Sequence, residues 1–287
     1  MRTRFPRILA GLIVAFCLAA PAQADTVRIG WTAWADAEFV TKLAARIIED
    51  RFETEVDLVQ TDIAPQYTGV AQGDLDFMLM SWQPVTHEDY IERYGPRLVS
   101  IGIIYDRARL GWVVPDYMYE AGITSIEDLN DSDVRDRLGG EITGIDPGAG
   151  LTRLSHDTIE QYGLDGYELL ESSDAGMTAA LRRAIRRDNW IVVTGWSPHW
   201  KFGAHELRYL DDPKGVLGGP ERIHIIARQN FYGEHEEIAS FLARMYLPIE
   251  QLQEYMFIAE DSSYEDAVKQ YISDNGSRVE YWVTGEL

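Results

Sequence analysis

Cysteine is almost absent from this sequence, which has one, Cys17, in 287 residues. Positive charge is scarce too, because 26 Lys and Arg stand against 47 Asp and Glu, for a formal net charge of −21. A chain without a basic surface has no electrostatic footprint for phosphates, so nucleic acid is excluded as a partner. Beyond the amino terminus there is no apolar run of about eighteen residues, so no membrane-spanning helix is expected.

Residues 1–24 have the three parts of a secretory signal peptide. Three arginines precede an apolar segment at 8–20, and Ala22-Gln23-Ala24 is a small-x-small cleavage site. An uncleaved anchor is the alternative, but the segment is shorter than the ~20 residues of a spanning helix. Phe16 before Cys17 is too large for a lipid-anchoring signal. The sequence therefore predicts cleavage after Ala24, export to the periplasm and a mature chain without disulfides.

The rest of the chain alternates between strand and helix patterns, which predicts an α/β fold with a mostly parallel sheet. A first unit has strands at 26–30, 56–59 and 76–80 and helices at 36–50 and 66–72. A second begins near residue 123, where Ser125 and Asp128 form a capping box, and has strands at 141–145 and 190–194 and helices at 151–162 and 177–187. A strand at 223–227 and further helices follow. Two such lobes would form a ligand cleft at the carboxyl ends of their strands.

A tryptophan follows three of these predicted strands. Trp34 comes after the first strand, Trp82 after the strand ending at Met80, and Trp196 after the strand ending at Thr194. A single tryptophan is more often a core residue, but three at strand ends would meet at one rim. Indole faces around a cavity attract a methylated cation, and each ring contributes roughly 0.5 to 2 kcal/mol. The pattern predicts a binding site for an onium compound.

Four motifs resemble those of the glycine betaine/choline substrate-binding proteins of ABC importers, and the similarity covers essentially the whole mature chain. The motifs are Gly30-Trp31-Thr32-Ala33-Trp34, Ser81-Trp82-Gln83-Pro84-Val85-Thr86-His87, Gly144-Ile145-Asp146-Pro147-Gly148-Ala149-Gly150 and Thr194-Gly195-Trp196-Ser197-Pro198-His199-Trp200. The resemblance implies a two-lobed periplasmic binding protein fold, similar to type II, with the ligand cleft between the lobes. It also implies as partners a small quaternary ammonium ligand and the permease and ATPase subunits of an importer.

The resemblance assigns roles to particular residues. Trp34, Trp82 and Trp196 would form a prism around the trimethylammonium head of the ligand. The backbone N–H groups of Gly144 and Ile145, together with His87, would hold a ligand carboxylate. A carboxylate there suits the predicted start of the helix at Leu151, because free N–H groups at a helix amino terminus attract anions.

Two further residues are candidates for the pocket. Trp112 would form a fourth wall if its segment is a strand, and the alternative is a core position. Asp36 stands where choline binders of the family have an acidic residue for the ligand hydroxyl, and the alternative is an amino-terminal cap of its helix. Leu110 replaces an aromatic residue of the choline binders. Together with His87, this leucine favours a ligand that carries a carboxylate.

The sequence therefore predicts a monomeric periplasmic carrier, not an enzyme, that binds glycine betaine or a related onium osmolyte and needs no cofactor or metal. Choline or trimethylamine N-oxide is the alternative ligand, and an exported hydrolase is the alternative class, since Ser155-His156-Asp157 has the residue types of a triad. We expect residues 25–114 and 218–287 to form lobe 1 and residues 115–217 to form lobe 2, with residues 1–24 removed.

Overall fold

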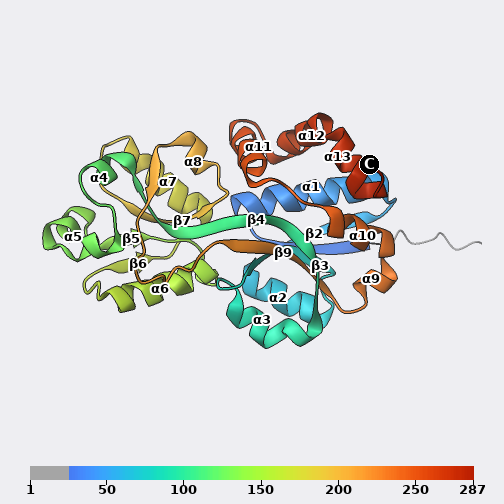
Figure 1. Cartoon of the computed structure of the whole chain (residues 1–287), viewed down its shortest axis with the longest axis horizontal. Coiled ribbons are helices and arrows are strands. Elements are labelled where there is room, and N and C mark those ends of the chain that lie inside the picture. The colour runs from blue at the N-terminus through green and yellow to red at the C-terminus, as the bar shows by residue number, and fades with distance from the viewer. Residues whose placement is uncertain (1–25) are drawn as a thin grey trace, which may run out of the picture.

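The structure is a computed structural model that describes residues 26–287, so the predicted signal peptide and its cleavage site lie outside the described residues. A mixed sheet runs through the elongated molecule and carries helices on both faces (Figure 1). Its strand order is β2-β1-β3-β9-β4-β7-β5-β6, and β8 pairs with β4. We call lobe 1 the half that contains β1 to β3 and β9, and lobe 2 the half that contains β5 to β8.

Lobe 1 contains both ends of the described chain. Helix α1 covers one face of its sheet with the predicted apolar stripe, in which Phe39, Leu43 and Ile47 are buried. The carboxyl-terminal helices pack on α1 and on the sheet (Figure 1). The elements are β1 (Thr26–Trp31), α1 (Ala35–Arg51), β2 (Glu55–Gln60), α2 (Ile63–Gln72), β3 (Phe77–Gln83), α3 (Glu88–Tyr94), a 3-10 turn (Gly95–Arg97), β9 (Glu221–Arg228), α9 (Phe231–Glu234), α10 (Glu236–Arg244), α11 (Ile249–Asp261), α12 (Tyr264–Asp274) and α13 (Gly276–Thr284).

Lobe 2 is smaller and is built around four strands, β5 to β8, together with the second part of β4. The predicted capping box is present, since Ser125 and Asp128 cap a 3-10 turn instead of an α-helix. The elements are α4 (Asp116–Glu120), the 3-10 turn (Ile126–Asn130), α5 (Ser132–Leu138), β5 (Glu141–Thr143), α6 (Gly150–Tyr162), β6 (Glu168–Leu170), α7 (Asp174–Ile185), β7 (Val192–Ser197), α8 (Lys201–Ala204) and β8 (Leu207–Tyr209).

A strand that the sequence patterns did not reveal, β4 (Leu98–Pro115), belongs to both lobes. Its first part, to Ala108, pairs with β9, and its second part, from Arg109, pairs with β7 and β8. β4 and β9 run antiparallel to all their partners, whereas β1 and β5 run parallel to theirs. The expectation of a mostly parallel sheet is therefore wrong for the centre of the molecule. The predicted lobe boundaries near Val114 and Leu217 stay predictions.

The antiparallel pairing also corrects the predicted ends of two strands. Trp82 lies inside β3 and Trp196 lies inside β7, instead of in the loops that follow. Trp82 is opposite Ile223 of β9, and Trp196 is opposite Leu110 of β4. The long strands β9 and β4 supply hydrogen-bond partners beyond the point where apolar patterning ends, so the two tryptophans remain in regular sheet.

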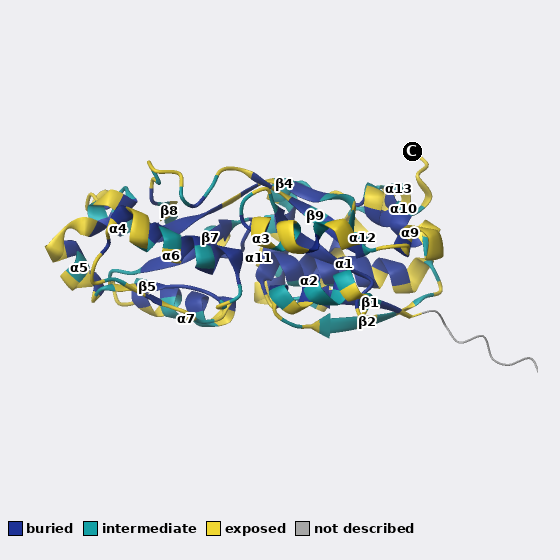
Figure 2. Ribbon diagram, turned by 90° about the horizontal axis from the view of Figure 1, so that it is seen from below, coloured by how far each residue is buried: buried dark blue, intermediate teal, exposed yellow. Residues whose placement is uncertain are grey.

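Buried residues form a continuous band through both lobes, with exposed residues on the outer turns of the helices (Figure 2). Trp112, Tyr105 and Phe39 are among the largest side chains that are fully buried. Within residues 26–287, no helix is long and apolar enough to cross a membrane.

The close contact between β4 and β8 gives a test of the sheet. A Cβ at Gly111 would lie 2.4 Å from Cδ1 of Tyr209, whose ring stacks on Phe202 at 5.1 Å between centroids. We expect Gly111→Ala to lower the free energy of unfolding by about 1–3 kcal/mol, because the ring must leave its stack. Urea unfolding measures this change. Gly233→Ala in α9, where a Cβ meets no atom within 4 Å, is the control, and an equal loss in both variants would contradict the contact.

Candidate functional site

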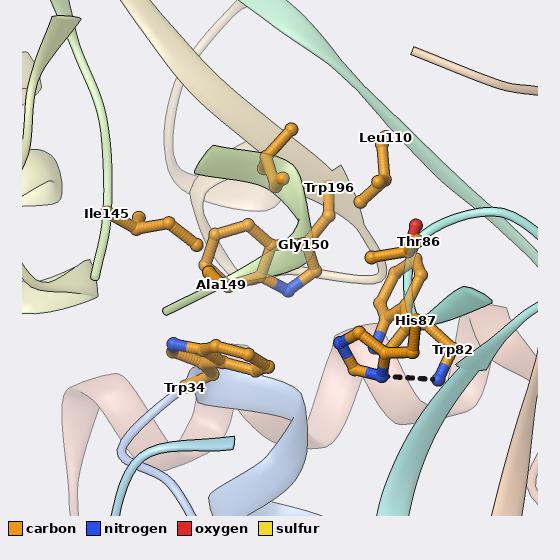
Figure 3. A pocket seen from close by; sticks show the side chains of 10 residues that line it. Trp34, Trp82, Thr86, His87, Leu110, Ile145, Ala149, Gly150 and Trp196 are labelled. Carbon is orange, nitrogen blue, oxygen red and sulfur yellow. Dashed lines mark hydrogen bonds between the residues drawn. The ribbon is translucent and has the colours of Figure 1, made fainter. Parts of the chain in front are cut away.

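A cavity lined by residues of both lobes lies where the two lobes meet. Figure 3 shows the rings of Trp34, Trp82 and Trp196 around it, together with His87. The remaining lining residues are Thr86 and Leu110 and, from the turn before α6 and its first residues, Ile145, Ala149, Gly150 and Leu151. The structure therefore brings the three predicted tryptophans to one cavity, although they are far apart in the sequence.

Each of two indoles is fixed by a carboxylate of the other lobe. Trp34 of lobe 1 donates its Nε1–H to Oδ2 of Asp146 in lobe 2, at 2.7 Å. Trp196 of lobe 2 donates its Nε1–H to Oδ1 of Asp36 in lobe 1, at 3.0 Å. The two rings are 6.4 Å apart at an angle of 58°. Both hydrogen bonds have a charged acceptor, which strengthens them and sets the orientation of the rings.

The Trp82 ring meets Tyr105 edge-on at 6.5 Å, and its backbone fixes His87. The N–H of Trp82 donates to Nδ1 of His87 at 3.1 Å, so the proton of the neutral imidazole is on Nε2. Figure 3 shows this second nitrogen on the cavity side of the ring. Burial lowers the pKa of His87 to about 3, so the ring presents a neutral N–H donor and no positive charge at ordinary pH.

The amino terminus of α6 faces the cavity from lobe 2. Gly150 and Leu151 line it, and the first N–H groups of a helix have no partner within the helix. No hydrogen bond between the described residues uses the Ile145 N–H. The Gly144 N–H, by contrast, donates to the carbonyl of Leu170 at 2.9 Å. The expectation that Gly144 offers its N–H to a ligand does not fit this arrangement, because the sheet between β5 and β6 continues through Gly144.

Two other predicted pocket residues lie behind the cavity walls. Trp112 is fully buried and donates its Nε1–H to Oγ of Ser155 at 3.0 Å. Asp36 is also fully buried, and it accepts hydrogen bonds from Trp196 and from the Tyr105 hydroxyl. Neither residue is part of the cavity lining. Burial raises the pKa of Asp36 to about 6, against the opposing effect of its two hydrogen bonds.

Further hydrogen bonds join the lobes around the cavity. Asp174 of α7 accepts the Ala35 N–H at 3.1 Å, at the first residue of α1. Tyr90 donates its hydroxyl to the carbonyl of Gly148 at 2.9 Å, and Arg153 donates to the carbonyl of Val85 at 3.2 Å. Contacts between the two lobes therefore surround the cavity.

The sequence patterns singled out Asp36, one of the two carboxylates that orient the rings, but neither Asp146, the other one, nor Asp174. Asp146 lies within the motif at 144–150. It is the motif's one charged side chain, which could have marked it as a functional residue. Asp174 is 139 residues from its partner Ala35, and no local pattern marks it. Among residues 26–287, no group of three or more His, Cys, Asp or Glu side chains is placed to hold a metal ion.

The family described as the substrate binding domain of ABC-type glycine betaine transport systems matches residues 25–274 of the chain. A glycine betaine/carnitine transport binding protein, GbuC of Listeria monocytogenes, is 36% identical over 156 residues, which are 53% of this chain and 52% of that protein. The chain thus aligns with about half the length of that relative. The glycine betaine-binding periplasmic protein OusX of Dickeya dadantii is 21% identical over 92% of this chain and 90% of its own length.

Two solved structures are similar over nearly the whole chain. Lactococcal OpuAC, in its closed-liganded conformation complexed with glycine betaine, superposes with a TM-score of 0.83 at 32% identity, covering 91% of this chain and all of that one. A choline binding protein of an ABC transporter, in complex with choline, has a TM-score of 0.83 at 28% identity over 91% and 92% of the two chains. The two-lobed α/β fold predicted from the sequence is confirmed by these similarities.

The close contact between the start of α6 and lobe 1 can be tested by adding a side chain at Gly150. A Cβ at Gly150 would lie 2.1 Å from the carbonyl oxygen of Thr86, closer than any contact allows. We expect Gly150→Ala to hold the lobes apart, because backbone atoms on both sides must separate. Spin labels on cysteines introduced at exposed Glu92 and Glu160 would measure a longer distance. Gly148→Ala is the control, since a Cβ there meets nothing within 4 Å, and equal label distances in both variants would contradict the contact.

Proposed function

Because this chain belongs to the family of substrate-binding domains of ABC-type glycine betaine transport systems, we propose that it binds glycine betaine or a close onium relative in a tryptophan cage. The bound ligand would then be delivered to an ABC importer. The observation that carries the proposal is the meeting of Trp34, Trp82 and Trp196 at one cavity between the lobes.

The three indoles suit a methylated cation. A quaternary ammonium has no N–H to donate, so it gains little from a hydrogen-bonding pocket and more from ring faces that exclude water. Trp34 and Trp196 cannot turn freely, because Asp146 and Asp36 hold their indole N–H groups. A cage with fixed rings loses little conformational entropy when the ligand enters.

The polar end of the cavity suits a carboxylate. His87 supplies an Nε2–H donor, and the Ile145 N–H and the first turn of α6 supply backbone donors. We therefore assign the ligand carboxylate to His87, Ile145 and the amides at Gly150 and Leu151, which replace Gly144 in this role. Leu110, where choline binders have an aromatic ring, adds only an apolar contact.

Choline and trimethylamine N-oxide remain the alternative ligands, because both carry a methylated onium centre. The similarity to the choline-bound structure supports choline as an alternative ligand. Calorimetric titration with glycine betaine, proline betaine, carnitine, choline and trimethylamine N-oxide ranks them directly. A ligand with a carboxylate is expected to bind most tightly.

The setting follows from the family and from the amino terminus. Relatives such as OusX are periplasmic binding proteins, and residues 1–24 have the composition of a signal peptide. The mature protein would be a periplasmic monomer that works with a permease and an ATPase. Residues 25–114 with 218–287 and residues 115–217 would close as two lobes by a hinge motion in β4 and the segment before β9.

The hydrolase alternative has less support. Ser155 is buried and accepts the indole N–H of Trp112, while His156 pairs with Glu171 at 2.9 Å. The two residues therefore do not form the hydrogen bond of a nucleophile and its base. The matched family is one of transport proteins, and we propose that the chain binds its ligand without turnover.

Loss of one cage wall tests the role of the tryptophans. We expect Trp82→Ala and Trp196→Ala each to weaken binding of glycine betaine by roughly 1 to 3 kcal/mol, because a ring face is lost. Isothermal titration calorimetry measures the affinity. Trp190→Ala removes an indole that does not line the cavity, so its affinity should equal that of the unmodified protein. If all three variants bind equally well, the cage is not the binding site.

Loss of the histidine donor tests the carboxylate assignment. His87→Ala should weaken glycine betaine by about 1–3 kcal/mol and choline much less, since only the former has a carboxylate to accept the Nε2–H. Because the pKa of His87 is lowered to about 3, His87 contributes no pH dependence of affinity between pH 5 and about 9. Exposed His156→Ala is the control. Equal losses for the two ligands would show that the assignment is wrong.

A further inference from the structure

Lys201 is a buried lysine that the proposed binding site does not use. It is the first residue of α8, it is fully buried, and its Nζ has no hydrogen-bond partner in the described part of the chain. The Nζ lies 4.2 Å from the ring centroid of Trp196. Lys201 does not line the cavity, whereas Trp196 does. One indole of the cage is therefore in contact with an ammonium group of the protein itself.

Charged and titratable groups of several elements surround Lys201. Asp36 and Asp174 both favour its protonated form, and the neighbouring His199 donates its Nε2–H to Asp174 at 3.0 Å. Burial lowers the pKa of His199 to about 4, so His199 is neutral. The groups that face Lys201, directly or through these acids, are Asp36 on α1, Tyr105 on β4, Asp174 on α7, His199 before α8 and Tyr264 on α12.

The two acids differ in how firmly they hold a negative charge. Burial alone would raise the pKa of Asp174, but its contacts with His199 and Lys201 bring that pKa below the usual value. Asp36, with its pKa raised to about 6, loses its charge more readily as the pH falls. Burial lowers the pKa of Lys201 to about 7, against the attraction of the two acids. The charge next to Trp196 therefore changes within the neutral range.

An indole that already faces one cation attracts a second cation less strongly. The ring offers its negative π-face to Lys201, and a positive head in the cavity would be repelled by the protonated amine across a medium of low dielectric constant. When Lys201 is neutral, this repulsion disappears and the carboxylates of Asp36 and Asp174 remain. A rise in pH therefore removes positive charge beside Trp196 and increases the affinity for the onium ligand.

We propose that Lys201 is a positioning residue of the cage that sets, through its charge, how strongly Trp196 attracts an onium head. This inference rests on the proposed function, because it assumes that an onium ligand occupies the cavity. Binding of the ligand and protonation of Lys201 oppose each other, so the protein releases protons when the ligand binds near neutral pH.

The pH profile of affinity tests the proposal. In the unmodified protein the affinity for glycine betaine should fall about three- to tenfold from pH 8.5 to 6.5, the scale of a partly screened repulsion inside a protein. Lys201→Met keeps the length and the apolar contacts of the side chain without its charge, and its affinity should stay constant from pH 8.5 to 7, above the pKa of about 6 of Asp36. Exposed Lys269→Met on α12 is the matched control and should keep the original profile.

Proton release is a second measurement, which needs no variant. Calorimetric titration of the unmodified protein with glycine betaine at pH 7.5, well above the pKa of about 6 of Asp36, in two buffers with different heats of ionisation, gives the number of protons released. A positive number supports the proposal, and zero overturns it even if Lys201→Met fails to fold. A pH-dependent affinity between pH 8.5 and 7 that survives in Lys201→Met also overturns it, because Asp36 stays ionised over this range. If neither choline nor glycine betaine binds at any pH, the proposed function itself has failed.

Discussion

The cage depends on a reciprocal pair of hydrogen bonds between indole N–H groups and carboxylates. Trp34 of lobe 1 is held by Asp146 of lobe 2, and Trp196 of lobe 2 is held by Asp36 of lobe 1. Each ring is held in its orientation by a carboxylate of the opposite lobe. The shape of the cavity and the contact between the lobes are therefore linked, because the groups that orient the walls are distributed across the interface.

The polar side of the cavity uses dipoles where full charges would be costly. His87 is neutral because burial lowers its pKa to about 3, and the amides at the start of α6 carry only partial charge. In a chain with a net charge of −21, an onium head meets a favourable overall field, while a carboxylate needs local donors. Neutral donors in fixed positions can bind the carboxylate of a zwitterion. A buried charged residue in their place would need an ion-pair partner whenever the ligand is absent.

Local sequence patterns predicted most elements of the fold, such as α1 with its apolar stripe and the helix now seen at Gly150–Tyr162. They did not reveal β4, because Asp106, Arg107 and Arg109 interrupt its apolar pattern at the place where the strand changes partners. Antiparallel pairing across the centre of the sheet joins residues about 80 to 150 positions apart, and no local period in the sequence records it.

The same division applies to the site. The motifs singled out Trp34, Trp82, Trp196 and His87, because each stands beside a recognisable turn, and all four line the cavity. Trp112 and Asp36 were candidates for the cavity because of their positions in the sequence. Packing places both side chains behind the residues that line it. Gly144 was assigned by motif as well, and only the strand pairing reveals that its amide already has a partner.

The position of β9 between β3 and β4 has a consequence for the order of assembly. This inner strand comes from residues 221–228, after the whole of lobe 2 has been synthesised. Lobe 1 therefore cannot complete its sheet while the first two hundred residues of the chain are being synthesised. The strands of lobe 2 are nearer to one another along the chain. Pairing between strands that are distant in the sequence makes folding slow. The topology therefore favours folding of lobe 2 first and of lobe 1 last.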